Sequence, residues 1–227
     1  MTTRWSRALP ESAWITFALL AVALAWDASG LDLPFAHLAG SAQGFPWKDH
    51  WFLFDVLHEG GRHLAWLLVL GLCLAVWWPV GPLERITLRR RVQLAVSTLA
   101  AALAVGVLKK ASLTSCPWEL AQFGGVARYA SHWSRIVDGG AGQCFPAGHA
   151  SSGFAFLGGY FVFRDVDLRL ARRWLLGATA AGLVLGLAQQ WRGAHFMSHT
   201  LWTAVVCWIV ACGVDAAWPQ ATALAGS

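Results

Sequence analysis

The chain carries little charge for its length. Only 13% of its 227 residues are Asp, Glu, Lys or Arg, whereas about 25% is usual in soluble domains. Carboxylates are scarcest, with 12 Asp and Glu against 17 Lys and Arg. The formal net charge of +5 divides between loops on the two sides of the predicted fold, so it does not indicate a nucleic-acid partner. Internal repeats and low-complexity segments are also absent from the sequence.

Hydrophobic residues make up 57% of the sequence and gather in six uncharged runs. A membrane-crossing helix needs about 20 mostly apolar residues, so the shorter runs must recruit flanking residues. Many of the 15 Trp stand at run ends, as in the aromatic belts of membrane interfaces. We therefore predict an all-α fold: one integral membrane domain of six transmembrane helices, with the site in external loops. The predicted spans cover roughly 12–33, 64–80, 92–108, 146–163, 174–191 and 199–218.

Basic residues predict the orientation of this bundle. One set falls on the same side of six alternating spans, and the positive-inside rule assigns that side to the cytoplasm. We expect a multi-pass protein of the cell inner (cytoplasmic) membrane whose active site faces the periplasm or exterior. The first run lacks a clear cleavage pattern and is expected to remain as a helix. The orienting residues are Arg4, Arg7, Arg85, Arg89, Arg90, Arg91, Arg164, Arg169, Arg172 and Arg173.

All eight His fall on the predicted external side or at its boundary. Three distant segments, 109–117, 145–149 and 192–199, would meet there and bring together Lys, Arg and His side chains. Such a pocket favours an anion, and phosphate is the natural candidate because cations and imidazoles can bind it and transfer it. In the first external segment, 51–57 is predicted to be a helix in the interface or packed over the bundle. The polar residues that follow it could cap the site or face water.

These segments resemble the three motifs of the phosphatidic acid phosphatase type 2 and haloperoxidase superfamily. The matching residues are Lys109 with Cys116-Pro117, Pro146-Ala147-Gly148-His149, and His195-Phe196-Met197-Ser198-His199. The resemblance implies a six-helix membrane phosphatase, independent of metal and other cofactors, that acts on a lipid phosphate or polyprenyl diphosphate. His195 would attack phosphorus and form a phosphohistidine, and His149 would be the general acid. Lys109 and the backbone N–H of Gly148 would bind phosphate.

The first and third motifs depart from the family pattern. Cys116 and Gln189 stand where the family usually has arginines, and His199 stands where it has an aspartate. Other cations are therefore expected to bind the phosphoryl group. Arg192 is the first candidate, since it lies one helical turn from the usual position, followed by Arg128, Arg135 and Lys110. His199, one turn after His195, could orient its imidazole as an aspartate would.

Cys116 and Cys144 each adjoin a motif on the predicted oxidising side, so we expect them to form a disulfide. That bond would close a loop of roughly 28 residues and contribute on the order of 3 to 4 kcal/mol. It would also hold the Lys109 segment against the His149 turn.

Three alternatives stay open at this point. A lipid phosphotransferase would use the same site with a second lipid or a sugar as acceptor. His149, His195 and His199 could instead ligate a metal. An anion-binding or transport protein without phosphatase turnover would also need such basic groups, although transporters usually hold their substrate near the bilayer midplane.

Overall fold

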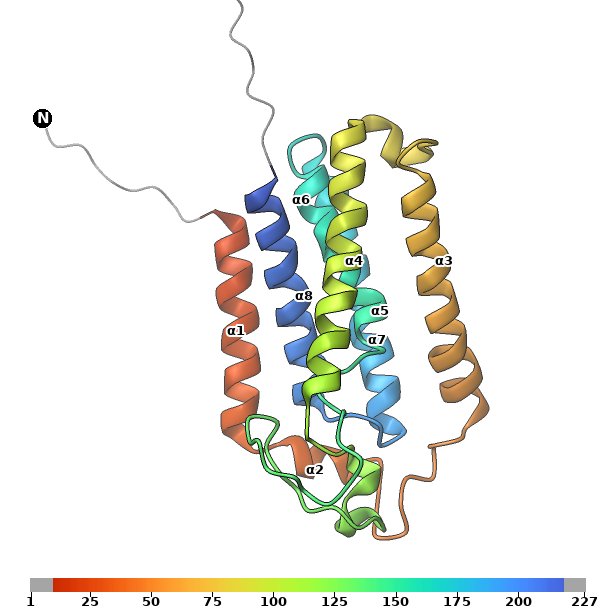
Figure 1. Cartoon of the computed structure of the whole chain (residues 1–227), viewed down its shortest axis with the longest axis vertical. Coiled ribbons are helices and arrows are strands. Elements are labelled where there is room, and N and C mark those ends of the chain that lie inside the picture. The colour runs from red at the N-terminus through yellow and green to blue at the C-terminus, as the bar shows by residue number, and fades with distance from the viewer. Residues whose placement is uncertain (1–9, 219–227) are drawn as a thin grey trace, which may run out of the picture.

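The computed structural model describes residues 10–218, which form an elongated bundle of helices (Figure 1). Arg4 and Arg7 lie outside the described residues. Within residues 10–218 the extended structure amounts to two isolated bridges. The elements are α1 (Glu11–Ser29), α2 (Asp32–Ala36), the π-helix η1 (Phe52–Gly60), α3 (Gly61–Leu74), η2 (Gly81–Arg85), α4 (Leu88–Ala111), η3 (Pro117–Glu119), η4 (Ala121–Phe123), α5 (Ser151–Phe154), η5 (Ala155–Gly158), α6 (Gly159–Phe163), α7 (Leu168–Trp191) and α8 (Met197–Ala217).

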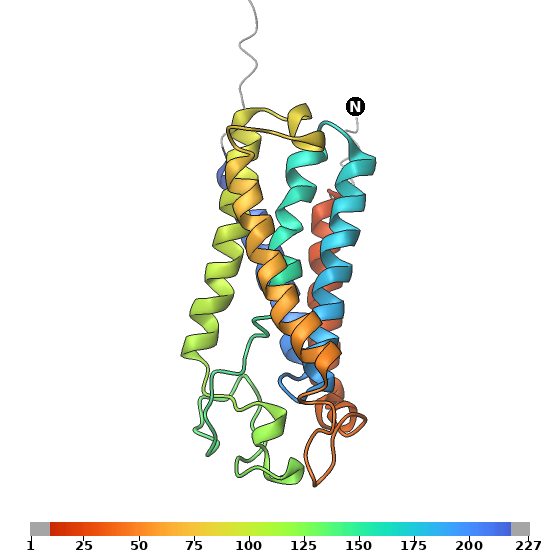
Figure 2. The same ribbon diagram turned by 90° about the vertical axis from the view of Figure 1, so that its right-hand side faces the viewer.

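The helical segments alternate in direction along the long axis of the bundle (Figures 1 and 2). One end holds the start of α1, the connection from α3 to α4 and the connection from α6 to α7. The opposite end holds α2, the long loop between α4 and α5, and the loop between α7 and α8. The arginine-rich connections thus lie at one end, and the three motif segments lie at the other.

Four helices are long and apolar enough to cross a membrane, namely α1, α4, α7 and α8. The two remaining predicted spans are shorter. The fourth begins as a helix at Ser151 and reaches Phe163, because residues 146–150 form a turn and not the start of a span. The second ends as a helix at Leu74, before the predicted limit of 80.

The apolar segment 51–57 is not the separate helix that we predicted. Most of it belongs to η1, which continues directly into α3. The helix continues through the Gly60-Gly61 pair and packs closely on α7 there. A Cβ at Gly61 would lie 2.8 Å from Cδ2 of Leu185. The glycine is therefore needed for a close approach and does not end the helix.

The centre of the bundle is closely packed around α5–α6. This segment contacts α4, α7 and α8, and Phe154 and Phe163 are fully buried in it. At one crossing, a Cβ at Gly153 would lie only 2.1 Å from the backbone N of Gly182. Two helix backbones are thus nearly in contact, and this packing fixes the start of α5 next to the motif that precedes it.

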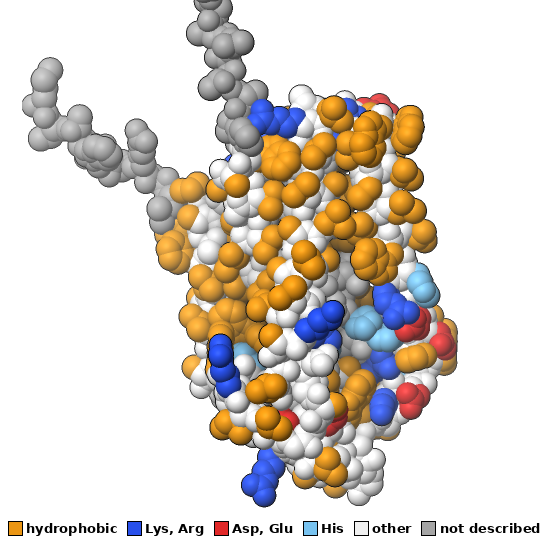
Figure 3. All heavy atoms as spheres, in the orientation of Figure 1, with side chains coloured by type: hydrophobic (Ala, Val, Ile, Leu, Met, Phe, Trp, Pro, Cys, Tyr) orange, Lys and Arg blue, Asp and Glu red, His pale blue; other side chains and the backbone are white. Residues whose placement is uncertain are grey.

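The outer surface of the helical region is apolar. Large side chains such as Trp14, Leu103 and Leu176 are 60 to 69% exposed, and Figure 3 shows hydrophobic side chains over most of the length of the bundle. Ala23 is the one buried residue of α1, and α3 buries none. A surface of this kind is stable in lipid and unfavourable in water, so the chain is a membrane-embedded helical protein.

Candidate active site

The first motif is joined covalently to the segment that leads into the second motif. Cys116 and Cys144, the two cysteines that we expected to pair, form a disulfide with their Cα atoms 5.2 Å apart. The backbone N–H of Cys144 also donates to the carbonyl of Thr114 at 3.0 Å. The segment that follows Lys109 is therefore fixed against the segment that leads to His149.

The second motif is also fixed to the start of α8. The N–H of Ala147 donates to Oγ1 of Thr203 at 2.9 Å, and the same hydroxyl donates to the carbonyl of His199 at 2.7 Å. The N–H of Trp118 donates to the carbonyl of Gly193 at 3.0 Å, which ties the loop after α4 to the third motif. Hydrogen bonds and a disulfide thus hold the three motifs together.

His195 and His199 lie side by side beneath these loops, 3% and 1% exposed. Their Nδ1 atoms are 3.4 Å apart, and Nδ1 of His195 lies 3.6 Å from Sγ of Cys144. The backbone of Cys144 interacts with both imidazoles. Burial lowers the pKa of His195 well below its ordinary value, and Lys109 acts in the same direction. A neutral imidazole is the form that can attack phosphorus.

His149 is the second imidazole of the site. Its Nε2 is buried, with no hydrogen-bond partner among residues 10–218. Burial is the largest cause that lowers the pKa of His149 to about 3, and the neighbouring His58, Lys109, Arg192 and Arg62 lower it further. A bound anion would oppose these effects and favour the protonated ring. Nε2 of His149 therefore has the properties of a group that takes up a proton, and can then donate it, when an anion binds.

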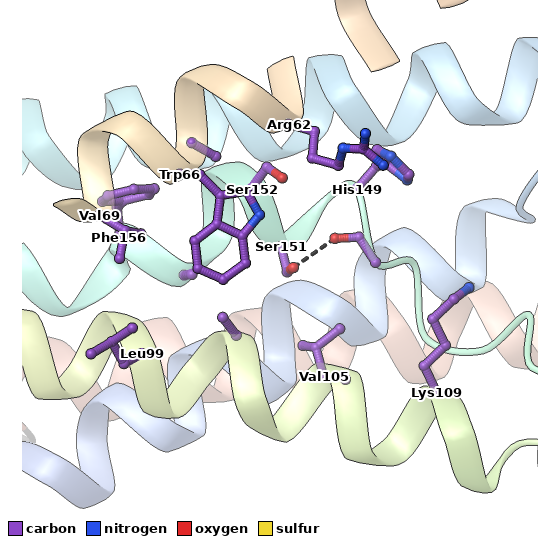
Figure 4. A pocket seen from close by; sticks show the side chains of 15 residues that line it. Arg62, Trp66, Val69, Leu99, Val105, Lys109, His149, Ser151, Ser152 and Phe156 are labelled. Atoms are coloured by element: carbon purple, nitrogen blue, oxygen red, sulfur yellow. Dashed lines mark hydrogen bonds between the residues drawn. The ribbon is translucent and has the colours of Figure 1, made fainter. Parts of the chain in front are cut away.

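A cavity of about 240 Å³ opens beside His149 between α3, α4 and α5. Figure 4 shows Lys109, His149 and Arg62 at one end of it and apolar side chains at the other. Gly148 packs on the Lys109 side chain, since a Cβ there would lie 3.6 Å from Lys109 Cδ. The apolar lining includes Trp66, Val69, Leu99, Val105 and Phe156. This cavity can accept a ligand with an anionic head and an apolar body.

Arg192 lies close to His149, and its position is set by several contacts. Its Nε donates to the carbonyl of Lys48 at 2.7 Å, and its Nη1 donates to Oε1 of Gln189 at 2.9 Å. The guanidinium also lies over the ring of Phe54, 4.8 Å from its centroid. Gln189 thus holds Arg192 in a chain that lacks the usual arginine at position 189.

Four predicted phosphate-binding residues do not line this cavity. One is Arg192, which lies near enough to His149 to lower its pKa. The other three, Lys110, Arg128 and Arg135, are exposed. They are also not among the groups that shift the pKa of His149 or His195. Lys110 is separated from Lys109 because consecutive residues of a helix point in different directions. Arg128 and Arg135 are in an irregular loop, where sequence gives little information about direction.

Two neighbours of His149 come from the polar residues that follow the apolar segment 51–57. The sequence did not decide whether these residues cap the site or face water. His58 of η1 stacks on His149 with ring centroids 3.8 Å apart, and Arg62 of α3 lines the cavity. The available signal was a group of charged residues directly after an apolar helical run. That signal does not identify the partner, which lies 91 positions later in the chain.

The donor set fits a metal poorly. Cys144, His195 and His199 place ligand atoms within 4.8 Å of one another, but the Cys144 sulfur is in a disulfide and cannot supply a thiolate. Nearby carboxylates are already engaged: Asp138 accepts from the N–H of Ser115 at 2.8 Å, and Glu119 accepts from the N–H of Cys116 at 2.7 Å. Two imidazoles beside a lysine remain, and these favour an anion.

Comparison with known proteins gives one match. The model of the PAP2 superfamily matches residues 90–222, which is more than half of the chain. No curated protein and no solved structure matches it. The matched region contains all three motifs, whereas η1 and α3, which supply His58 and Arg62, lie before it.

Proposed function

This chain belongs to the PAP2 superfamily, and from this we propose that it is a membrane phosphatase that removes phosphate from a lipid-linked phosphate or diphosphate through a phosphohistidine intermediate. Family membership supports a phosphatase-type activity in general. The lipid substrate, the covalent intermediate and the independence from metal are the specific parts of the proposal.

The cavity beside His149 is the observation that carries this proposal. Lys109 and His149 lie at its polar end, and apolar side chains line the remainder (Figure 4). A phosphate headgroup would occupy the polar end, and part of a hydrocarbon chain would lie along the apolar part. A second apolar cavity of about 510 Å³ lies between α3, α5 and α7 and shares Ser152 and Phe156 with the first. Lipid chains can therefore be accommodated on both sides of α3.

The proposed reaction has two steps. Nε2 of neutral His195 attacks phosphorus, the bond from phosphorus to the leaving oxygen breaks, and His149 gives that oxygen its proton. Water then attacks the phosphohistidine, His149 accepts a proton from it, and His195 leaves as inorganic phosphate forms. Lys109 and Arg192 balance the charge of the phosphoryl group, and the N–H of Gly148 contributes a hydrogen bond.

The surroundings of His195 support this assignment. Nδ1 of His195 lies 3.4 Å from Nδ1 of His199, and the carbonyl side of the Cys144 backbone also interacts with the ring. With the hydrogen of the neutral ring at Nδ1, Nε2 keeps its lone pair. Aspartates in catalytic dyads orient an imidazole in the same way. The carbonyl and His199 would replace that carboxylate here, with less stabilisation of a positive ring.

We also infer that six helical segments cross the membrane and that the site faces away from the cytoplasm. The support is the alternation of the segments and the separation of arginine-rich connections from the motif loops (Figure 1). The continuous helix of η1 and α3 is long enough to span. The α5–α6 segment is shorter, but it is enclosed by other helices.

Phosphate release by purified protein tests the proposal. The panel contains phosphatidic acid, a polyprenyl diphosphate, a lipid A phosphate and a water-soluble phosphomonoester, each with and without a metal chelator. We expect release from a lipid substrate that the chelator does not affect. His195→Ala and His149→Ala should abolish it, while His63→Ala, on an exposed position of α3, should not. Full turnover in His195→Ala would exclude the covalent mechanism.

Labelled substrate distinguishes hydrolysis from transfer. Acid-labile, base-stable radioactive phosphate on the protein, absent from His195→Ala, is expected for a phosphohistidine. Label recovered as inorganic phosphate identifies a phosphatase. Label recovered on an added acceptor lipid would identify a phosphotransferase that uses the same site.

A further inference from the structure

Four planar side chains stack one on the next, from Arg192 at the end of α7 to His149 in the loop before α5. The guanidinium of Arg192 lies over Phe54. Phe54 stacks on His58 with centroids 5.4 Å apart and an interplanar angle of 17°. His58 stacks on His149 with centroids 3.8 Å apart and an angle of 28°. Both central rings belong to η1, which lies outside the family match at 90–222.

The π-helical form of η1 accounts for this arrangement. A π-helix is wound more widely than an α-helix, and such segments are frequent at functional sites. The winding in η1 puts Phe54 and His58 on one face, where they stack on each other. The two rings of η1 thus lie between Arg192 and His149: Phe54 faces the guanidinium, and His58 meets the proposed general acid face-on.

A carboxylate lies beside the second ring of η1. Oε1 of Glu59 lies 3.0 Å from Nδ1 of His58, and the other Glu59 oxygen accepts from Arg62. Because a carboxylate stabilises an imidazolium, Glu59 favours a proton on His58 over one on His149.

The stacked imidazoles do not titrate independently. A positive charge on His58 lowers the pKa of His149, as do Lys109 of α4, Arg192 at the end of α7 and Arg62 of α3. Two imidazoles in contact seldom both carry a positive charge, so protonation of one to imidazolium makes protonation of the other more difficult. Glu59 is the one carboxylate among these residues, and it faces His58.

We propose that His58 is a positioning residue for His149: its ring holds the His149 ring in orientation by stacking, and its charge sets how readily His149 takes up the proton it donates. This inference rests on the proposed function, in which His149 is the general acid. It adds to the active site a residue of the N-terminal half that the three motifs do not contain.

Two substitutions separate orientation from charge. Phe at position 58 keeps a flat ring but cannot be protonated. In His58→Phe we expect kcat within about threefold of the wild type, and the alkaline limb of its pH profile, which reports the acid in the complex, should move to higher pH by about half a unit or more. His58→Ala removes the ring, and kcat should fall at least about tenfold while KM changes less than threefold. His63→Phe, five positions later on an exposed site, is the control and should match the wild type.

A titration without turnover tests the same claim. In protein with ¹⁵N-labelled histidine, the His149 ring should take up its proton at higher pH in His58→Phe than in the wild type or His63→Phe. An unchanged His149 titration together with an unmoved pH profile would overturn the proposal, and so would full kcat in His58→Ala. Failure of the wild type to release phosphate would contradict the proposed function, and the titration would still decide whether His58 acts on His149.

Discussion

Nδ1 of His195 and Nδ1 of His199 lie 3.4 Å apart, and both side chains are buried. At this distance at most one of the two nitrogens carries a hydrogen toward the other, so the tautomers of the two rings depend on each other. The His199 imidazole and the Cys144 backbone are therefore the groups placed to orient the proposed nucleophile, His195. Related proteins are expected to use a carboxylate for this.

Replacing His199 tests that dependence. In His199→Leu we expect kcat to fall at least about tenfold with little change in KM, because His195 loses a partner that orients it. His199→Asn, which restores a polar side chain, should recover part of the loss. Steady-state kinetics of both variants, with thermal unfolding to verify folding, provide the measurement. Equal activity of the Leu variant and the wild type would show that the Cys144 backbone alone orients His195.

Two adjacent lysines offer a matched comparison. Lys109 lines the cavity and Lys110 does not. Lys109→Met should reduce kcat/KM at least about tenfold, since a hydrogen bond to a charged group contributes about 1.5 to 3 kcal/mol. Lys110→Met removes the same charge one position away and should leave kcat/KM nearly unchanged. Similar losses in both variants would indicate a general electrostatic effect and not binding by Lys109.

The disulfide should contribute to both stability and activity. Its cysteines are 28 positions apart, and a closed loop of that size stabilises a fold by about 3 to 4 kcal/mol. We expect the Cys116→Ser, Cys144→Ser double variant, or the reduced wild type, to unfold at lower temperature and to lose turnover. Cys73→Ser alters a free cysteine and is the control. The idea would be excluded by mass spectrometry of non-reduced protein that finds free thiols at both positions.

Folding stability should decrease in mild acid. Unfolding restores the His149 pKa from about 3 to its ordinary value near 6.5, so the unfolded chain binds more protons between these pH values. Stability is therefore complete above pH 6.5 and is lost as pH falls, by about 2 kcal/mol at pH 5 from this residue. Thermal unfolding at pH 7.5 and pH 5 measures the loss. His149→Phe should show a smaller difference, and a saturating phosphate ligand should also reduce it.

The close crossing of α5 and α7 can be tested with two glycines. A Cβ at Gly153 would approach the backbone N of Gly182 to 2.1 Å, so Gly153→Ala should destabilise the protein by about 1 to 3 kcal/mol. Gly177, also in α7, has no neighbouring atom within 4 Å of its would-be Cβ. Gly177→Ala should therefore be neutral or slightly stabilising, since Ala is the better helix former. A thermal shift of the same sign and size in both variants would contradict the packing argument.

Local sequence properties predicted much of the helical fold. Apolar runs are continuous in the chain, so α1, α4, α7 and α8 overlap the expected spans, although the start of α7 at Leu168 lies six residues before the expected 174. The limits of the other two were less accurate, because a turn at 146–150 and a π-helix at 52–60 are decided by tertiary contacts. Motif spacing likewise brought Lys109, His149 and His195 to one site, with Gly148 beside Lys109.

Other parts of the site depend on contacts between distant residues. Arg128 and Arg135 were predicted from charge alone, and charge does not tell which way a loop side chain points. The stacking of His58 on His149 joins positions 91 apart, and no local pattern signals such a pairing. Arg192 was predicted from its helical spacing to His195 alone, whereas its contacts with Lys48 and Phe54 come from the other half of the chain.

The third helix has an unusual relation to the rest of the molecule. It buries no side chain, and a cavity lies on each of its flanks. Few protein atoms therefore pack against this helix, so in a bilayer we expect hydrocarbon chains to supply much of its packing. Extraction into a short-chain detergent should displace this helix more than its neighbours, and Arg62 and Trp66 would move with it.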